Sequence, residues 1–401
     1  MGKLAIYLPP FSSDYAGVCS TLFDFNSLIA INDGHCCTQN YVGYDEPRWN
    51  KTMKTTLCTE LRTIDAVFGN DKLVVKRVSD AADSLEPDFI AVLGSPVPAI
   101  IGMDMHGIAL EIEEQCTVPT FGFDTTGFNY YDKGMAMAAL ALFKRYAKDA
   151  DTKLPDSINI LGMTPLDYTH TDNGETLRQM LCDGGFRVLG SFFMGTTLQQ
   201  VRDVGKAAIN IAVSAGGLAL AKYLHQRFQT PYIATTPMGT KHGQHVLARL
   251  HDALHDDSGT SDNPSPEKAP SSQSALLIVG DQIVANALRE ALYFAGCDCS
   301  IDIASFFGMV SDLRAPHDHT LNSEKDLIKL LRSGTYCGVV GDPLIELIPG
   351  VDKLEHFKLP HPAVSSRLFW NNAPVFAAHD FDTFIDDIVR RSKSFDKENM
   401  K

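Results

Sequence analysis

Short apolar runs alternate with longer amphipathic stretches along most of the chain. Runs such as 89–95, 157–163 and 275–279 are almost continuously apolar, which is typical of strands buried on both faces. The stretches between them, of which 134–150 is a clear example, repeat their apolar residues at helical spacing. This alternation predicts an α/β fold of three doubly wound, Rossmann-like parallel-sheet domains. A first strand is expected at 3–8, KLAIYL.

One segment interrupts the alternation. Residues 255–274, HDDSGTSDNPSPEKAPSSQS, are rich in Ser, Pro, Asp and Gly and offer almost nothing to bury, which predicts a flexible linker. A strand–helix–strand pattern restarts directly after it. We therefore expect an N-terminal domain over 1–150 with a cluster-facing segment, a middle domain over 151–254 and a C-terminal domain over 275–401.

Composition narrows the classes of function. Of the 401 residues 44% are hydrophobic and 21% are charged, and the net charge is −14. This acidic balance argues against nucleic-acid binding, because phosphates favour clustered Lys and Arg. No uncharged apolar run reaches the roughly eighteen residues of a membrane span. The beginning of the chain, where Pro9-Pro10 ends a short apolar patch, does not resemble a signal peptide, so we expect a cytoplasmic protein.

Familiar catalytic motifs are absent from the sequence. It contains no P-loop, no GxGxxG after a strand and no GxSxG. Its nine cysteines are scattered and odd in number, which argues against a disulfide framework. His251 and His255 lie four apart on a helical pattern and could chelate zinc, but a solvated helix end fits them better. His317 and His319 fit a polar loop for the same reasons.

Four stretches, taken in order, resemble the component 1 proteins of the nitrogenase superfamily. Residues 13–37, SDYAGVCSTLFDFNSLIAINDGHCC, are similar to a small-residue turn, a helix and a Gly-rich turn that ends in a cluster-binding cysteine. Residues 58–73 carry VFGN where the family has VFGG, and 87–109 are similar to its strand followed by a cysteine and IGDD. GDPLIELIPG with FKLPHP, within 341–362, is similar to the closing part of the β-type subunits.

The resemblance implies a shared iron–sulfur cluster, and its ligands can be carried over one at a time. The family's typical subunit brings three cysteines to a cluster at the subunit interface. The central one matches Cys36 or Cys37, the first falls near Ser13, and the third falls at Pro96, which has no side-chain donor. Because a [4Fe–4S] unit normally needs four thiolates, a partner would hold most of a [4Fe–4S] or larger P-cluster-like group. Cys58 lies near the same face by resemblance and is a further candidate.

Oxygen ligands and a plain structural role remain open for this region. Ser13 or Asp14 could supply an oxygen ligand, and Glu60 is either a local hydrogen-bond partner or a solvated side chain. The alternative for Cys36 and Cys37 is a pair of buried thiols that bind nothing.

Two further positions separate the subunit types of the family. The active subunit carries a cofactor-binding cysteine after a middle-domain strand, where this chain has Ser214. Its second cofactor ligand is a late histidine; His361 lies in roughly that domain, in a setting that resembles the β-type subunit. The resemblance therefore implies the cluster-sharing partner, with a complex Fe–S cofactor possible in the other chain.

The resemblance implies a β-like subunit of a nitrogenase-like reductase, paired with an α-like component 1 chain as a heterodimer or α2β2 assembly. Electrons would come from a separate P-loop, ATP-dependent iron protein with its own [4Fe–4S] cluster. The alternative from another class is a scaffold subunit on which a complex metallocofactor is assembled. A periplasmic-binding-like sensor is a third possibility, which the VFGN and IIGMD stretches disfavour.

Overall fold

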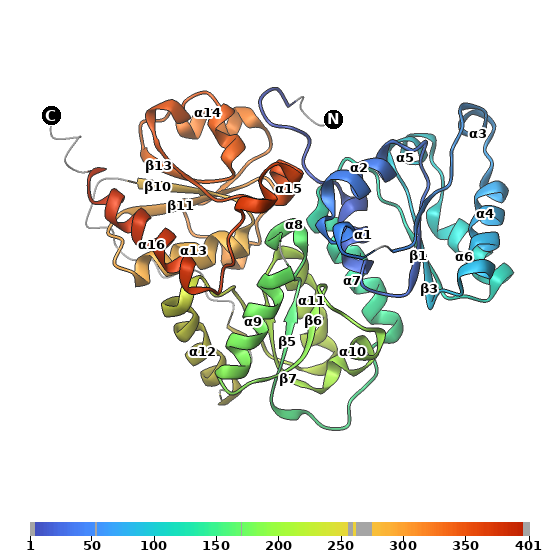
Figure 1. Ribbon diagram of the computed structural model, residues 1–401, viewed down its shortest axis with the longest axis horizontal. Coiled ribbons are helices and arrows are strands. Elements are labelled where there is room, and N and C mark those ends of the chain that lie inside the picture. Colours follow the sequence, from blue (N-terminus) through green and yellow to red (C-terminus); the bar gives the residue numbers. More distant parts are fainter. Residues whose placement is uncertain (1–4, 53, 170, 256–259, 262–274, 396–401) are drawn as a thin grey trace.

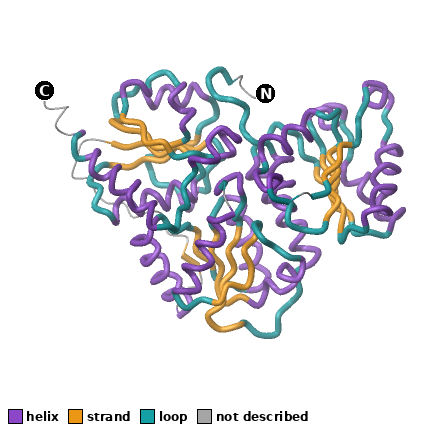
Figure 2. Tube along the Cα trace, viewed as in Figure 1, coloured by secondary structure: helices purple, strands orange, loops and turns teal. Residues whose placement is uncertain are grey.

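The computed structural model describes residues 5–52, 54–169, 171–255, 260–261 and 275–395 (Figure 1). Within them, three parallel sheets with helices on both faces lie around a common junction (Figures 1 and 2). We call these the N-terminal unit (strands β1–β4), the middle unit (β5–β9) and the C-terminal unit (β10–β14). The expected fold class is confirmed.

The N-terminal unit holds four strands in the order β2-β1-β3-β4, all parallel. Leu28 and Ala30 of β1 pack toward α4 and α6, whereas Ile29 and Ile31 pack toward α1 and α7. Burial on both faces explains why the strand runs are continuously apolar. The bounds are β1 Ser27–Ile31, β2 Thr56–Cys58, β3 Phe89–Leu93, β4 Thr120–Phe123, α1 Asp14–Leu22, α4 Asp71–Leu85, α6 Met105–Cys116 and α7 Tyr131–Tyr146.

The middle unit has the strand order β6-β5-β7-β8-β9, again parallel. Helices α9 and α12 pack against one face, and α10 and α11 against the other, where α11 also contacts α7 of the N-terminal unit. The bounds are β5 Leu154–Leu161, β6 Arg187–Phe192, β7 Ala207–Ala212, β8 Tyr232–Ala234, β9 Thr260–Ser261, α9 Thr171–Asp183, α10 Leu198–Asp203, α11 Ala215–Phe228 and α12 Gly239–His255.

The C-terminal unit has the order β12-β11-β10-β13-β14, also parallel. Helices α13 and α16 share one hydrophobic core with α9 and α12, so the middle and C-terminal units are packed together. Helix α14 covers the other face. The bounds are β10 Ala275–Val279, β11 Ser300–Ser305, β12 His319–Thr320, β13 Tyr336–Gly341, β14 Glu355–Lys358, α13 Gln282–Phe294, α14 Glu324–Leu331 and α16 His379–Ser392.

Short helices complete the connections. The α-helical ones are α2 Cys36–Asn40, α3 Thr63–Phe68, α5 Pro96–Ile101, α8 Pro165–Tyr168 and α15 Pro362–Ser365. A π-helical turn covers η1 Tyr41–Asp45, and 3₁₀ turns cover η2 Pro47–Asn50, η3 Val204–Lys206, η4 Ser311–Leu313, η5 Pro343–Leu347, η6 Val351–Lys353 and η7 Ser366–Asn372. No helix in the described part of the chain is both long and apolar enough to cross a bilayer.

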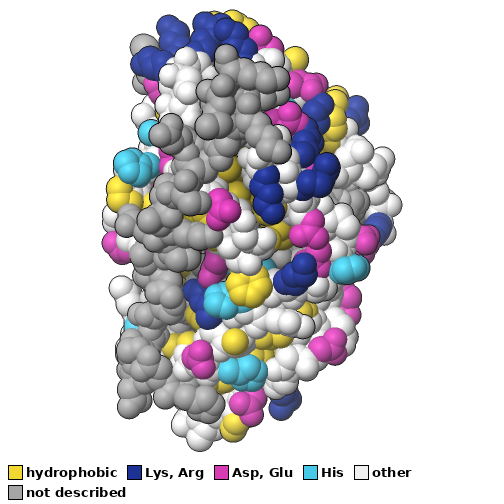
Figure 3. Space-filling model, turned by 90° about the vertical axis from the view of Figure 1, so that its left-hand side faces the viewer, with side chains coloured by type: hydrophobic (Ala, Val, Ile, Leu, Met, Phe, Trp, Pro, Cys, Tyr) yellow, Lys and Arg dark blue, Asp and Glu magenta, His cyan; other side chains and the backbone are white. Residues whose placement is uncertain are grey.

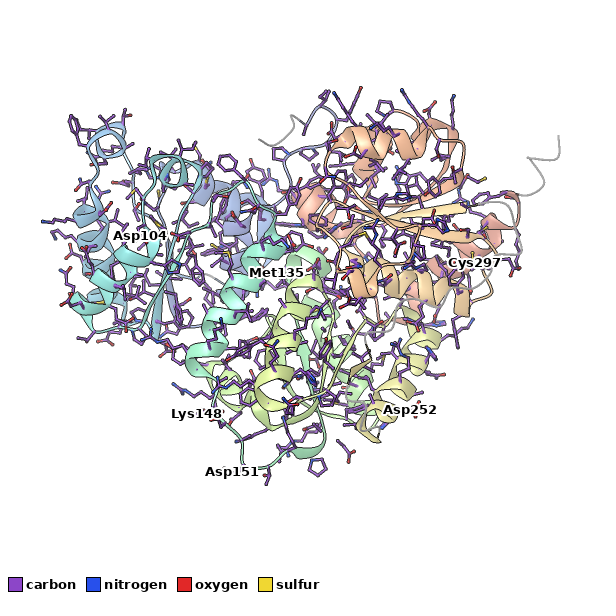
Figure 4. The ribbon with its side chains drawn as sticks, turned by 180° about the vertical axis from the view of Figure 1, so that it is seen from behind. Asp104, Met135, Lys148, Asp151, Asp252 and Cys297 are labelled. Carbon is purple, nitrogen blue, oxygen red and sulfur yellow. The ribbon has the colours of Figure 1, made fainter. Side chains whose placement is uncertain are left out.

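The carboxyl edges of the middle and C-terminal sheets meet at the junction. Helix α8 follows β5, α15 follows β14, and the two helices contact each other, while α8 also contacts α1 (Figure 1). A small core fills this place, and its member Met135 on α7 is labelled in Figure 4. The core consists of Tyr131, Met135, Leu166, Phe307, Ala363 and Val364.

The strand expected at 3–8 is wrong over its described residues. Residues 5–8 form no strand; instead the backbone N–H groups of Ile6, Tyr7 and Leu8 donate to the carboxylate of Glu324 at the start of α14. Leu8 is buried in the core of the C-terminal unit. The apolar run therefore forms a bent strap in place of a strand, and it is anchored by the Glu324 carboxylate and by the buried Leu8 side chain.

The proposed domain boundaries at 150, 254 and 275 stay predictions. Most of the expected linker, 256–259 and 262–274, lies outside the described residues. Thr260 and Ser261, within that segment, pair with β8 as an edge strand of the middle sheet. Strands β1 and β2 and helix α4 were not expected as elements of their own; β1 falls within the stretch 13–37, which the resemblance describes as a turn, a helix and a second turn.

Candidate functional site

The five candidate residues lie along the carboxyl edge of the N-terminal sheet. Cys36 and Cys37 follow β1, Cys58 ends β2, and Pro96 follows β3. Ser13 precedes α1 and pairs through its backbone with Tyr130, beyond β4. In parallel sheets this edge is where ligands usually bind.

Hydrogen bonds at the strand ends hold this edge together. Asn32, directly after β1, accepts a bond from Thr59 at its side chain (2.7 Å) and from Ser95 at its backbone carbonyl (2.8 Å). Asp14 accepts bonds from the backbone N–H groups of Thr126 and Gly127. A Cβ atom on Gly127 would lie 2.7 Å from Pro96 Cγ, so the loop after β4 packs closely on the start of α5. The structure therefore joins the segments that carry Ser13, Pro96 and the cysteines.

Asp33 shapes the turn that carries the two cysteines. Its Oδ2 accepts bonds from the backbone N–H groups of Cys37 (2.7 Å) and Thr38 (3.0 Å), and His35 adopts a left-handed conformation with φ of 81°. The Cys58 thiol donates to the Asp33 carbonyl oxygen at 3.0 Å. The Asp-Gly pair in NDGHCC is a turn signal that would have identified Asp33 from the sequence.

The two adjacent thiols differ in exposure. Cys36 is exposed, whereas Cys37 is half-buried and packs against the core of the N-terminal unit. Burial, followed by the charge of Asp33, raises the pKa of Cys37 to about 11. Since the thiolate is the form that binds metals, Cys36 is the more available ligand.

The other candidates are less suited to bind a metal. Pro96 opens α5 and has no side-chain donor, and the thiol of Cys58 is already hydrogen-bonded to Asp33. Ser13 Oγ is buried and makes no hydrogen bond of ordinary geometry among the described residues. The Asp14 carboxylate is occupied by the backbone groups named above and by that of Tyr15. Glu60 is half-exposed, with His35 at 3.8 Å and Arg77 at 3.6 Å.

Apolar side chains stand exposed on α3 and α5, the two helices that follow β2 and β3 and contact each other. Phe68 is 80% exposed and Ile100 72% exposed. We call this set the apolar rim: Ile64, Val67, Phe68, Val97, Ile100 and Ile101. The side of the molecule formed by the middle and C-terminal units instead mixes acidic, basic and hydrophobic side chains, with Lys and Arg gathered at its upper end (Figure 3). A gathered apolar surface is typical of a protein interface.

Behind the turn lies a buried charged group that no sequence pattern indicated. Arg48 bonds both carboxylate oxygens of Glu46 (2.7 and 2.8 Å), the backbone carbonyl of Ser20 and that of Phe193 in the middle unit. Asp45, which accepts a bond from Ser12, is buried; burial raises its pKa to about 7 although Ser12 opposes the shift. This group fixes the π-helical turn after α2 and connects the first two units.

The donor set fits only one edge of an iron–sulfur cluster. Among the described residues, no group of three or more His, Cys, Asp or Glu side chains is arranged to hold a metal ion. Cys37 and Cys58 lie on the same sheet edge as Cys36, whereas Cys297 lies in the C-terminal unit, far from the N-terminal unit where Asp104 is labelled (Figure 4). One exposed thiol can complete a cluster that another polypeptide holds by its remaining ligands.

Comparison with known proteins decides the family. The pattern of the nitrogenase component 1 type oxidoreductases matches residues 13–292. The chain belongs to this family. Its fold agrees: a solved structure of nitrogenase Cp1 at pH 5 superposes with a TM-score of 0.65 over 98% of this chain and 91% of that one, at 15% identity.

Sequence relatives within the family match only part of the chain. It is 25% identical over 204 residues to the nitrogenase iron-molybdenum cofactor biosynthesis protein NifE of Clostridium pasteurianum, covering 50% of this chain and 44% of that protein. It is 21% identical over 197 residues to one of the subunits of the light-independent protochlorophyllide reductase of Nostoc punctiforme, covering 47% and 39%. The match thus spans less than half the length of these relatives.

Ser214 and His361, the two positions that were compared with the family's active subunit, both contact other polar groups of this chain. Ser214 caps α11, accepting from Gly217 N–H, and donates to the carbonyl of Gly162 at 2.7 Å. His361 lies at the junction, where its Nε2 is 3.2 Å from the Tyr131 hydroxyl and 3.4 Å from Asp167 Oδ1.

The histidines that were considered as zinc ligands contact other groups where the structure describes them. His251 is half-buried, stacks on Phe186 and bonds the carbonyl of Gly184 at 2.8 Å, so it packs against α9 where a solvated helix end was expected. The His255 side chain lies outside the described residues. His319 begins the edge strand β12 and lies 3.2 Å from the Tyr336 hydroxyl, in place of the expected loop.

Proposed function

We propose that this chain is the β-like subunit of a cytoplasmic nitrogenase-like reductase complex that shares an interfacial iron–sulfur cluster with an α-like subunit. The cluster would relay electrons from an ATP-dependent iron protein to the active site of the α-like subunit. The observation that carries the proposal is a single exposed thiol, Cys36, at the same sheet edge from which the helices of the apolar rim start. A thiol that must reach metal held by another chain belongs on such a surface.

The proposal gives each residue of the site a limited role. Cys36 binds one edge of the cluster, and Asp33 holds the turn from which Cys36 projects. Cys37 stays protonated at neutral pH, because burial and the Asp33 charge raise its pKa to about 11. Ser13, Cys58 and Pro96 line the same edge. When bound, the cluster supplies one-electron transfer, with a potential that burial and hydrogen bonds adjust.

The proposed partners follow from what this chain lacks. The sequence contains no P-loop, so ATP use belongs to a separate iron protein with its own [4Fe–4S] cluster. The present chain offers a single available thiolate. An α-like component 1 subunit would therefore have to supply the remaining ligands, in a heterodimer or α2β2 assembly. The apolar rim is the surface on which such a subunit would pack.

The test is metal analysis of the complex purified without oxygen. We expect iron and inorganic sulfide in the wild type and a loss of both in Cys36→Ala, while Cys37→Ala loses less. Cys182→Ala, a half-buried thiol on α9, is the matched control and should keep its iron. Unchanged iron in the Cys36→Ala, Cys37→Ala double variant would reject the ligand assignment.

A scaffold for metallocofactor assembly is the second candidate. The 25% identity to a NifE protein, whose name refers to cofactor biosynthesis, favours it. A scaffold releases its cluster to an acceptor protein and turns over no substrate, whereas a reductase consumes ATP and forms product. Incubating the loaded complex with the iron protein, ATP and a cluster acceptor separates the two: transfer of iron without ATP-coupled turnover supports the scaffold.

A further inference from the structure

A hollow in the C-terminal unit lies apart from the site of the proposed function. It offers about 650 Å³ to water-sized molecules, at the amino ends of the neighbouring strands β13 and β14. The carboxyl edge of the same sheet meets the middle unit at the junction, so the hollow faces away from the junction. Its size is within the range of roughly 300–1,000 Å³ that is usual for small-molecule sites.

Two segments of the chain form this hollow. One leads from the end of α14 into β13 and contributes Arg332. The other includes the turn η6 before β14 and contributes Lys353. Three further side chains give the lining an apolar part, which we call the apolar floor: Leu331, Tyr336 and Leu354. A small molecule in the hollow would therefore meet both positive charge and apolar surface.

The two cations of the lining have no acidic partner within the described part of the chain. Arg332 and Lys353 are both exposed, and neither side chain forms an ion pair or a hydrogen bond there. Asp352, the acid among the described residues of the lining, instead accepts the backbone N–H of Gly350 at 3.2 Å. The hollow therefore has excess positive charge, in a chain whose net charge is −14.

Gly350 brings the two segments into close contact. Its φ of 113° lies in the left-handed region that favours glycine, and a Cβ atom there would lie 2.9 Å from Arg332 Cγ. The stem of Arg332 thus packs against the turn that leads to Lys353. A cation is favoured directly after the end of α14, which accounts for Arg332 alone, because no α-helix ends at Lys353. The pair of cations therefore points to an anionic ligand.

We infer that this hollow binds a small organic phosphate monoester, with its phosphate group between Arg332 and Lys353 and its organic group on the apolar floor. A guanidinium donates two parallel hydrogen bonds to phosphate oxygens, and an ammonium adds a point charge. A metal cation would be repelled by the two positive side chains. A nucleic acid fits less well, because the net charge of −14 opposes a long polyanion.

The experiment is calorimetric titration of the full chain with phenyl phosphate, with phenol as a probe of the ring alone and inorganic phosphate as a probe of the charge alone. We expect phenyl phosphate to bind most tightly, and to bind more weakly as NaCl is added. Its affinity should fall about tenfold from pH 8 to pH 5, because the second pKa of a phosphate monoester is about 6 and the dianion is the form bound.

Three results would contradict this assignment. Absence of phenyl phosphate binding, or equal affinity for phenol, would overturn the inference. Equal affinity for inorganic phosphate would show that the apolar floor takes no part, and would overturn the assigned class of ligand.

Variants at exposed positions keep the test independent of folding. Arg332→Gln and Lys353→Gln should each weaken the binding of phenyl phosphate about tenfold, since each removes a charge-assisted hydrogen bond. Asp352→Asn should tighten the binding, because it removes an opposing charge. Lys325→Gln, at an exposed position of α14 outside the lining, is the matched control and should bind like the wild type. Wild-type affinity in both Arg332→Gln and Lys353→Gln would refute the site without affecting the proposed cluster at Cys36.

Discussion

The carboxylate of Asp33 accepts a hydrogen bond from the backbone N–H of Cys37 at 2.7 Å. The negative charge of this carboxylate also raises the pKa of the Cys37 thiol. This contact makes two adjacent cysteines chemically unequal. Cys36 projects into solvent, and Cys37 is held as a half-buried thiol.

The first prediction concerns alkylation of the metal-free chain. With iodoacetamide at pH 8, Cys36 should be modified before Cys37, because Cys37 is half-buried and its pKa of about 11 leaves little thiolate. Peptide mass spectrometry would follow both sites. Asp33→Asn should speed the reaction of Cys37, since it removes a charge that opposes ionisation. Faster modification of Cys37 than of Cys36 in the wild type would contradict this assignment.

The second prediction concerns Arg48. Arg48→Met should lower the free energy of unfolding by about 3–5 kcal/mol, because it leaves the buried carboxylate of Glu46 without its counter-ion. Urea denaturation measures the change. The control is Lys76→Met, which breaks an exposed ion pair with Asp80 and should have little effect. Equal stability of the two variants would mean that the Arg48 group is not a structural connection.

The third prediction concerns acid stability at the contact between α12 and α13. Glu290 faces His242, His245 and Arg249. Burial alone would raise the pKa of Glu290, but the hydrogen bond from His242 and the charge of Arg249 are the main effects that outweigh it and lower the value from 4.5 to about 2. Because the folded-state pKa is lowered, the stabilisation is present above about pH 4.5 and is lost as the pH falls toward 2.

Glu290→Gln should therefore cost about 2–3 kcal/mol at pH 7 and less as the pH approaches 2. Thermal or urea unfolding across that pH range measures the difference. As a matched change, Glu346→Gln breaks an exposed pair with Lys358 and should behave like the wild type. A cost that does not shrink below pH 4.5 would show that the charge of Glu290 is not responsible.

The fourth prediction concerns the apolar rim. The chain without its partner should self-associate, because the apolar side chains of Phe68 and Ile100 are largely exposed. The Phe68→Ser, Ile100→Ser double variant should shift the mass measured by light scattering toward the monomer. Leu110→Ser, at a 71% exposed position on α6, is the control and should leave the association unchanged. A monomeric wild-type chain would contradict the interface.

The strands in the interior of the sheets were predictable because they are buried on both faces. The runs that became β3 and β10 are continuously apolar, and few other structures accommodate such runs between helices. β1 was missed although it is equally buried, because it lies inside a stretch whose family resemblance emphasised the helix before it and the turn after it. β2 has only three residues and no distinctive pattern.

The sequence leads to one sheet edge for the candidate residues, and their role as a cluster site stays a prediction. The resemblance indicated Cys36 or Cys37, and the topology brings Ser13, Cys58 and Pro96 to the same sheet edge. Which of the two cysteines is exposed depends on the orientation of the short helix α2, and the sequence does not reveal that orientation. The contacts of His361 with Tyr131 and Asp167 were also beyond reach, since the three residues are distant in the chain and belong to no local motif.

The strap at Ile6–Leu8 has a consequence for how the molecule is assembled. Its three backbone amides dock on a carboxylate 316 to 318 residues further along the chain. During synthesis, the earliest of these residues leave the ribosome long before their acceptor exists. Attachment of the strap thus cannot precede the synthesis of Glu324, and it closes the chain into a loop that holds the first two sheets and strands β10, β11 and β12 of the third.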